Sequence, residues 1–578
     1  MTTRLPSQEK PWLKHFPKES LDIALPKCRL YEYLKATLVE HPNKIGIHYY
    51  GTDVKNKDIV KRIDEAANSF KKMGIKKGDI VSFLTVTTPE TIYAMYGLNK
   101  LGAICNFIDP RMDISRIRTA IADVNSTVLI TLDLPWPKVE RILGDVNLKH
   151  IIVVTANDSL PGYAKVYRKL TVKATPVPYS ETVIKWADFM KSGKGTKAKM
   201  EPYEENSTAI ITYTGGTTGI AKGVMLTDDG LNAVAYSFRY SGVDMDTSTD
   251  NFLDIMPVFA SYGVVCGIHM PMAFGFKNIL CPQFTPDTLG KLIKKYKANA
   301  MMGVPSFYER IMHSRDLWDV DLSYLKVTGC GGDTMNPGLE ERFNKFMKEH
   351  GAKYPLSQGY GMSEVTGAAT CCFNNVYKDS SAGFPLLAVT VGIFEPGTTN
   401  EVGYGVEGEV CLSGPTVMKG YYENQAETDN ILITHPDGTK WIHSGDIGYL
   451  DEEGFLFING RIKHMICRFD GHKVFPVSIE AVVGKHKAVG TCCVVGIPDP
   501  DRAQGEMPLV IVELKHTLQG EVDQAQIRQE IMDLCEKECE ERGRPIDVTF
   551  IDEMPHTLMG KNDFATLSKM YKDYKVQR

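Results

Sequence analysis

Two separated segments carry residue types suited to binding a nucleotide and its phosphates. The first, at 213–223, reads YTGGTTGIAKG. Glycines let backbone N–H groups approach an oxyanion, threonine hydroxyls add donors, and Lys222 adds a positive charge. The loop is not a Walker A sequence, because Ala221 and Gly223 flank the lysine where that pattern needs Gly and then Ser or Thr. A structural turn is the alternative for this composition.

The second segment, at 359–364, reads GYGMSE. Tyr360 offers an aromatic face for a base, Ser363 a hydroxyl and Glu364 a carboxylate. A carboxylate near phosphates is suited to binding Mg²⁺. Taken alone this segment is a weak signal, since a surface tyrosine and glutamate would look the same.

Two more segments lie nearer the C-terminus. In the HSGD sequence at 443–446, Asp446 could accept hydrogen bonds from two ribose hydroxyls with help from Arg461; a salt bridge fixing a hairpin is the alternative. The PHTLMGK sequence at 555–561 places Lys561 after a glycine on an expected turn, from which it could project into a cleft as a point charge. An ordinary solvated lysine is the alternative there.

In this order, the segments resemble the adenylate-forming enzymes, which include acyl- and aryl-CoA synthetases, peptide-synthetase adenylation domains and firefly-type luciferases. The resemblance extends from about Leu30 to Asp563. Within the family, the sequence is most similar in character to the medium- and long-chain fatty acyl-CoA ligases. It implies an enzyme that uses ATP, Mg²⁺ and coenzyme A. The family's hinge between domains falls at Lys463, and its pantetheine channel at Gly471.

The resemblance also implies a role for each segment. The phosphates of ATP would be held by Thr214, Gly215, Gly216, Thr217, Thr218, Gly219 and Lys222. Adenine would lie between Tyr360, followed by Gly361 and Met362, and the backbone of Gly331, Gly332 and Asp333. Ser363 would reach the α-phosphate, Glu364 would bind Mg²⁺, and Asp446 with Arg461 would hold the ribose. Lys561 would bridge the acyl carboxylate and the α-phosphate until the C-terminal domain rotates and withdraws it.

The segment 255–276 contains no Asp, Glu, Lys or Arg. It is long enough to span a bilayer, but its prolines and glycines favour a buried helix-and-turn segment instead. The resemblance places it along the acyl pocket, with Phe259, Ala260 and Tyr262 as candidate contacts; many relatives carry His at position 260. An uncharged lining predicts a hydrophobic, medium- or long-chain carboxylic acid as the substrate.

The expected function is therefore an ATP-dependent acyl-CoA ligase that forms an acyl-adenylate and then a thioester. Several alternatives stay open. They are an acyl-AMP ligase that loads a carrier protein, a CoA ligase for aryl or other acids, a luciferase-like oxidase, and an inactive nucleotide-binding scaffold. The presence of Lys561 argues against the scaffold.

Charge and cysteine content narrow the partners and the compartment. The 578 residues include 66 basic and 71 acidic side chains, a formal net charge of −5, so no general attraction to nucleic acid or anionic lipid is expected. Peripheral membrane contact and oligomeric state stay open. The 13 cysteines show no zinc-site spacing, and the N-terminus lacks a secretory apolar region, which together predict a cytoplasmic protein.

The elements that must position these segments can be read from hydrophobic periodicity. Helices at 59–73 and 91–101 alternate with strands at 80–86 and 104–108, which predicts a mostly parallel sheet. The loop at 213–223 is expected to join a strand at 208–214 to a helix capped by Thr227 or Asp228. Beyond residue 397, short strands and a turn at 451–454 predict an antiparallel unit.

The predicted fold is α/β plus α+β. A large domain at 1–460 would hold two doubly wound α/β subdomains and a small distorted β-barrel. A hinge at 461–463 would lead to a small mobile α+β domain at 464–578.

Overall fold

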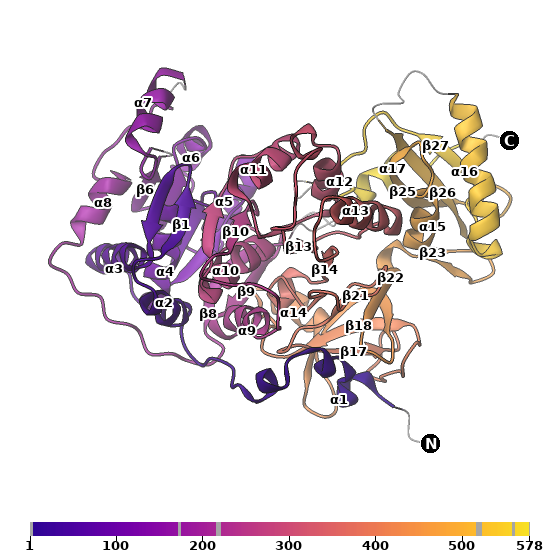
Figure 1. Ribbon diagram of the computed structural model, residues 1–578, viewed down its shortest axis with the longest axis horizontal. Helices are drawn as coiled ribbons and strands as arrows, with labels where there is room; N and C mark the ends of the chain where they lie inside the picture. The colour runs from indigo at the N-terminus through magenta and orange to yellow at the C-terminus, as the bar shows by residue number, and fades with distance from the viewer. Residues whose placement is uncertain are drawn as a thin grey trace.

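The computed structural model describes residues 4–155, 157–171, 175–214, 221–515, 523–557 and 561–576. Figure 1 shows a large body built from most of the chain and a smaller C-terminal lobe in yellow. In the part of the chain that the structure describes, the body contains two large sheets, one five-stranded antiparallel sheet, and a two-stranded sheet of β15 (Thr370–Cys371) and β16 (Phe384–Pro385). Its mixed α/β architecture agrees with the predicted fold class.

The first large sheet has eight strands. Six consecutive strands are parallel, as the alternation of helices and strands predicted, and the two strands at one edge pair antiparallel. Strand β5 is buried along its whole length, which is typical of a parallel sheet covered on both faces. The strands in spatial order are β19 (Gly420–Tyr421), β9 (Gly223–Thr227), β8 (Thr208–Tyr213), β4 (Ile104–Phe107), β3 (Ile80–Leu84), β5 (Val128–Leu132), β6 (His150–Val154) and β7 (Val183–Lys185).

The second large sheet has seven strands, all parallel except the β1–β2 pair. Its strands β12 and β13 are parallel neighbours. The strands in spatial order are β14 (Ser357–Gln358), β13 (Val327–Cys330), β12 (Ala300–Gly303), β10 (Asn251–Asp254), β11 (Lys277–Leu280), β1 (Ile45–Tyr49) and β2 (Thr52–Lys55).

Helices pack against both sheets, and two of them begin at the caps that their sequences favour. Thr88 accepts a hydrogen bond from the backbone of Thr91 at the start of α4, and Thr227 does the same for Gly230 at the start of α9. The helices of the body are α1 (Pro6–Glu9), α2 (Leu30–Glu40), α3 (Asn56–Lys72), α4 (Pro89–Lys100), α5 (Ile114–Ala122), α6 (Trp136–Ile142), α7 (Gly162–Thr171), α8 (Trp186–Ser192), α9 (Asp228–Arg239), α10 (Met270–Phe274), α11 (Leu289–Tyr296), α12 (Pro305–Met312), α13 (Pro337–Glu349) and α14 (Gln425–Ile431).

The antiparallel unit is a sheet in which one long strand, β21, pairs with three others. Its strands are β17 (Thr390–Phe394), β18 (Gly408–Ser413), β20 (Leu432–Thr434), β21 (Lys440–Leu450) and β22 (Leu456–Arg461). The turn predicted at 451–454 joins β21 to β22, with the N–H of Asp451 bonded to the carbonyl of Phe455. The N-terminal segment packs on this unit, because Trp12 is fully buried against Gly454.

The C-terminal lobe has its own apolar core beginning at Ile466. It contains the strands β23 (Ile466–Cys467), β24 (Lys473–Val474), β25 (Val489–Pro498), β26 (Glu506–Leu514) and β27 (Asp547–Phe550), with the helices α15 (Pro476–Val483), α16 (Gln524–Glu538) and α17 (Phe564–Met570). Helix α16 buries Ile527, Ile531 and Cys535 on one face, as its apolar periodicity requires.

The uncharged segment 255–276 is not a membrane-spanning helix. It forms a π-helix at Gly263–His269 followed by the short α10. In the described ranges, no helix is long and apolar enough to cross a bilayer.

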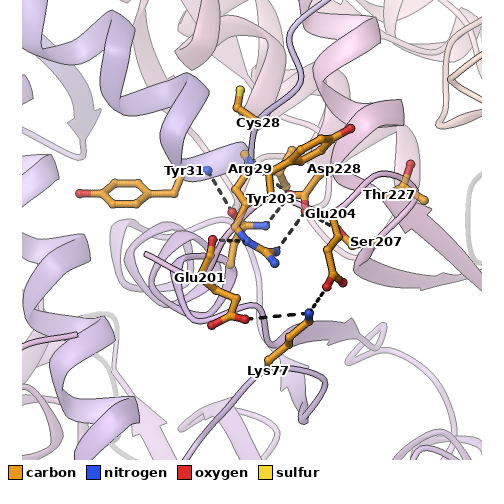
Figure 2. Close-up of polar contacts among 12 residues, drawn as sticks. Cys28, Arg29, Tyr31, Lys77, Glu201, Tyr203, Glu204, Ser207, Thr227 and Asp228 are labelled. Carbon is orange, nitrogen blue, oxygen red and sulfur yellow. Dashed lines mark hydrogen bonds and ion pairs between the residues drawn. The ribbon is translucent and has the colours of Figure 1, made fainter. Parts of the chain in front are cut away.

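A buried ion pair fixes the end of the β8–β9 hairpin that lies opposite the loop (Figure 2). Arg29 lies 3.3 Å from Asp228, the first residue of α9, and both side chains are almost fully buried. The same guanidinium donates to the carbonyls of Glu201 and Pro202. The pair therefore joins the start of α2, the connection that precedes β8, and α9.

Candidate adenylation site

The threonine- and glycine-rich loop joins two antiparallel strands. Strands β8 and β9 pair from Thr208–Thr227 to Tyr213–Gly223, so the predicted direct passage from strand to helix was wrong: β9 intervenes. At the loop's base, the N–H of Thr214 donates to the carbonyl of Lys222 at 3.1 Å. The predicted phosphate contacts at Gly215, Gly216, Thr217, Thr218 and Gly219 lie outside the described residues.

The ammonium group of Lys222 lies beside an acidic and an aromatic residue. Its Nζ is 2.9 Å from a carboxylate oxygen of Glu427 on α14 and 4.5 Å from the ring centroid of Tyr421. The Tyr421 hydroxyl donates to Oε1 of Glu364 at 2.6 Å. Tyr421 therefore connects the loop to the second predicted segment.

Glu364 is 7% exposed and lies in a 3₁₀ turn at Ser363–Val365. The hydrogen bond from Tyr421 orients its carboxylate and leaves lone pairs on Oε2. A single oriented carboxylate beside a phosphate-binding loop fits Mg²⁺, which is commonly held by one or two carboxylates together with substrate phosphates. The neighbouring Ser363 shares a 2.8 Å hydrogen bond with the hydroxyl of Ser261.

Tyr360 and the Gly331–Gly332 backbone line one cavity, as expected for a slot that holds a planar base. Gly331 follows β13, and its N–H donates to the carbonyl of Gly303. The chain is tightly packed at Gly361, where a Cβ atom would lie 2.5 Å from the carbonyl oxygen of Gly367, so a side chain is excluded.

Asp446 connects this slot to the antiparallel sheet. Its Oδ2 accepts the Tyr360 hydroxyl at 2.6 Å, and its Oδ1 accepts Nε of Arg461, across the β21–β22 ladder, at 2.7 Å. Asp446 is 3% exposed. Because a carboxylate has about four lone-pair sites, these two bonds leave acceptor capacity for ribose hydroxyls.

Lys561, on the C-terminal lobe, lies near Asp333 of the body. Lys561 and Asp333 both keep surface open to solvent, but surrounding protein atoms partly desolvate them. Burial lowers the pKa of the Lys561 ammonium, and nearby Asp333 acts in the opposite direction. Burial raises the pKa of Asp333, which Lys561 opposes. Asp446 and Glu364 also lie close enough to influence Lys561.

A hydrogen bond joins the start of α13 to α15 of the lobe. Asn336, which caps α13, donates to the carbonyl of Glu480 at 3.3 Å. Gly471, by contrast, lies in a turn of the lobe where a Cβ would meet nothing within 4 Å. Its neighbours Arg468 and Asp470 contact Arg542 of the same lobe. Among the described residues, Lys561 therefore lies near charged side chains of the body, while the neighbours of Gly471 contact a residue within the lobe.

The predicted acyl-pocket residues divide between two places. Tyr262 lines the cavity beside Tyr360. Phe259 and Ala260 are buried in the preceding turn, where the Arg111 guanidinium lies 5.1 Å from the Phe259 ring centroid. Neither belongs to the lining of that cavity.

The predicted site omitted Tyr421, Glu427 and Ser261. Ser261 lies within the uncharged segment 255–276, which was predicted to line the acyl pocket. Its place in the site is shown only by its hydrogen bond to Ser363. Tyr421 reaches the site because β19 pairs with β9, with Tyr421 opposite Val224. A two-residue strand carries no periodicity from which this could have been predicted.

Comparison with known proteins agrees with this geometry. The AMP-binding enzyme family model matches residues 34–422, and the model of the AMP-binding enzyme C-terminal domain matches residues 478–561. The chain belongs to the AMP-binding enzyme family. It is similar to a long-chain-fatty-acid–CoA ligase of Bacillus subtilis, with 30% identity over 87% of this chain and 89% of the relative.

Two further relatives support the same assignment. A probable 4-coumarate–CoA ligase of Dictyostelium discoideum is 29% identical over 78% of this chain and 79% of its own. A crystal structure of the anthranilate–CoA ligase AuaEII with anthranoyl-AMP has the same fold, with a TM-score of 0.81, 21% identity, and coverage of 95% and 98% of the two chains. This family member is an AMP-forming acid–thiol ligase whose substrates are a small-molecule acid, ATP and CoA.

Proposed function

We propose that this ligase activates hydrophobic monocarboxylic acids of medium to long chain. The observation that carries the proposal is a pair of adjoining cavities in whose linings none of the described residues is charged. An uncharged wall offers no partner for the ammonium of an amino acid or the second carboxylate of a diacid, because burying an unpaired charge is costly. The long-chain specificity named for the Bacillus relative supports the same substrate class.

The first cavity is lined by Gly331, Gly332, Tyr360 and Gly361 of the predicted adenine slot together with the predicted acyl-pocket residue Tyr262. The described residues that line the second all have apolar side chains, and those beyond the shared wall are Val243, Met245, Phe252, Met270, Phe274, Phe276, Ala300, Val327 and Phe373. The two cavities share three wall residues, Phe238, Met302 and Cys371. An acid whose carboxylate lies near Tyr360 could extend its chain past this wall into the second cavity, which favours a long aliphatic acid over a compact aryl acid.

In the proposed reaction the acid's carboxylate attacks the α-phosphorus of ATP and pyrophosphate leaves. Both reactants are anions, so their repulsion is a large part of the barrier. Lys561 and Lys222 place positive charge beside the phosphates, and Ser363 donates to the α-phosphate. The CoA thiolate then attacks the acyl carbonyl carbon, and AMP leaves with the carboxylate oxygen that formed the anhydride.

Glu364 would hold Mg²⁺ together with phosphate oxygens, as the orientation of its carboxylate by Tyr421 allows. When bound, the cation would supply charge neutralisation at the phosphates. Asp446 and Arg461 would fix the ribose, so that the α-phosphate meets the acid at one place in the cleft.

Replacing Phe238 by alanine tests the proposed acid class. Phe238 is 6% exposed in the wall shared by the two cavities. Removing its ring should join the cavities, and we expect kcat/KM for acids of twelve or more carbons to rise about tenfold relative to hexanoate, a change of about 1.4 kcal/mol. Pyrophosphate release across a series of acids gives the profile. A profile unchanged from the wild type, or a wild-type preference for acetate or amino acids, would refute the assignment.

A substitution at the proposed hinge tests rotation of the C-terminal lobe. Lys463 lies in a 3₁₀ turn at Ile462–His464, directly after β22. Proline fixes φ, so Lys463→Pro should hold the lobe in one orientation, and we expect one half-reaction to be lost while the other is retained. Formation of the acyl-adenylate and formation of the thioester are measured separately. The second is measured with CoA and with a phosphopantetheine-bearing carrier protein as the acceptor. Full turnover in the variant would contradict a hinge at this position.

A further inference from the structure

Strand β21 contains a bulge at the residues that present Asp446. Glu409 on β18 pairs with Ile447, while Cys411 pairs with His443. One residue of β18 therefore lies opposite the three residues Ser444, Gly445 and Asp446 of β21. Gly445 has a φ of +72°, a conformation that glycine adopts without strain. A bulge of this kind removes regular hydrogen bonds between the paired strands and changes the direction in which a side chain points.

Side chains replace the ladder bonds that the bulge loses. The Ser444 hydroxyl donates to the carbonyl of Val410 at 2.6 Å and accepts the N–H of Asp446 at 3.0 Å. Oε1 of Glu409 accepts the N–H of Gly445 at 3.0 Å. The backbone on the N-terminal side of Asp446 is thus held by a buried carboxylate, which is 6% exposed.

Two histidines complete this arrangement. Nδ1 of His443 donates to Oε2 of Glu409 at 2.9 Å, and Nε2 of the same ring faces Nε2 of His435 at 3.0 Å. With Glu409 ionised, His443 is protonated on Nδ1 and accepts at Nε2, and His435 donates. Both rings are buried. The chain of bonds runs from His435 through His443 and Glu409 to the backbone of Gly445.

The same neighbourhood does not form a metal site. Glu409, Cys411 and His443 have ligand atoms within 4.8 Å of one another. However, both oxygens of Glu409 and both ring nitrogens of His443 already take part in hydrogen bonds. Only the Cys411 thiol would be left to bind a cation, and a single ligand does not make a site.

We propose that Glu409, oriented by His443, is a positioning residue that sets the geometry with which Asp446 binds the ribose hydroxyls of the nucleotide. This inference rests on the proposed nucleotide site. If Glu409 is removed, the N–H of Gly445 loses its acceptor and the bulge can relax. The Asp446 side chain then keeps its charge but no longer points toward the ribose. The preference of the site for ATP over 2′-deoxy-ATP should therefore fall.

The test is the ratio of the dissociation constants for 2′-deoxy-ATP and ATP, measured on the full chain by calorimetry. Both nucleotides are measured on one preparation, so the ratio does not depend on the fraction of folded protein. A hydrogen bond to a charged group predicts a wild-type ratio of about 10–100, which Asp446→Ala should reduce to about 1. We expect Glu409→Ala to reduce the ratio at least about fivefold, with no further loss when both substitutions are combined.

Two further variants keep the test decisive. Glu409→Gln retains the size of the side chain and one acceptor oxygen, for which Gly445 and His443 must compete, and we expect an intermediate ratio even if the alanine variant is unstable. Cys411→Ala removes a buried neighbour on the same strand that makes no bond to the bulge, and it should keep the wild-type ratio.

The outcomes distinguish the positioning role of Glu409 from the ribose-binding role of Asp446. A wild-type ratio in both Glu409 variants, together with a lost ratio in Asp446→Ala, would overturn the positioning role alone. A wild-type ratio in Asp446→Ala would overturn the ribose site of the proposed function, and with it this inference. An equal loss in Cys411→Ala would show a general disturbance of the sheet, which would also overturn it.

Discussion

Replacing Lys561 by alanine should slow formation of the acyl-adenylate by about 10²–10³-fold, as the loss of one preorganised charge-stabilising group commonly does. The same variant should transfer a preformed acyl-adenylate to CoA at the wild-type rate. The difference follows from when the ammonium is needed. Its charge offsets repulsion between the acid and the α-phosphate, and this repulsion is gone once pyrophosphate has left.

The position of Lys561 supports this expectation. The lysine lies near Asp333, Asp446 and Glu364, and burial lowers the pKa of its ammonium. Partial desolvation strengthens its interaction with a developing negative charge, because the effective dielectric constant is lower than in water. The C-terminal lobe that carries Lys561 would rotate before the thiol attacks.

ATP–pyrophosphate exchange measures the first half-reaction, and thioester formation from synthetic acyl-adenylate measures the second. Lys569→Ala is the matched control, since Lys569 is an exposed lysine of the same lobe, and both half-reactions should be unchanged in it. Equal loss of both half-reactions in Lys561→Ala would refute the role assigned to this lysine.

Replacing Asp228 by alanine should lower the free energy of unfolding by about 3–5 kcal/mol, the usual cost of leaving a buried partner charge uncompensated. Asp228 accepts hydrogen bonds from the backbone of Leu30 and from Asn99, Ser207 and Arg29. Without it, the Arg29 guanidinium stays buried with one ion-pair partner fewer, and three other donors lose their acceptor (Figure 2).

Urea unfolding followed by circular dichroism gives the change in midpoint. Glu349→Ala is the control, because it removes an exposed helical pair with Lys345, and such pairs contribute little to stability. The Asp228 variant should unfold at a clearly lower urea concentration than this control. Coincident midpoints would mean that the network in Figure 2 does not hold the hairpin in place.

Local signals in the sequence predicted much of the framework. The helix capped by Thr227, the turn at 451–454 and the strand that enters the phosphate loop all depend on residues close together in the chain, and the structure has each of them. Strand β9 was missed because its five residues directly follow a glycine-rich loop.

Contacts between distant residues could not be predicted in this way. Beyond residue 397 the sequence predicted short strands, but β21 is one strand of eleven residues, and the Glu409 side chain replaces a ladder bond missing at its bulge. The hydrogen bond between Tyr421 and Glu364 joins residues 57 positions apart, and that between Ser261 and Ser363 joins residues 102 apart. Only tertiary packing creates such pairs.

Transfer of ¹⁸O from the acid to AMP tests most directly whether the enzyme activates its substrate through an acyl-adenylate. The enzyme is incubated with ATP, Mg²⁺, CoA and palmitate labelled with ¹⁸O in both carboxylate oxygens, and the products are weighed by mass spectrometry. If the carboxylate attacks the α-phosphorus, each turnover releases AMP with one ¹⁸O and an acyl-CoA with the other. Unlabelled AMP, or ¹⁸O in inorganic phosphate beside ADP, would contradict activation through an acyl-adenylate.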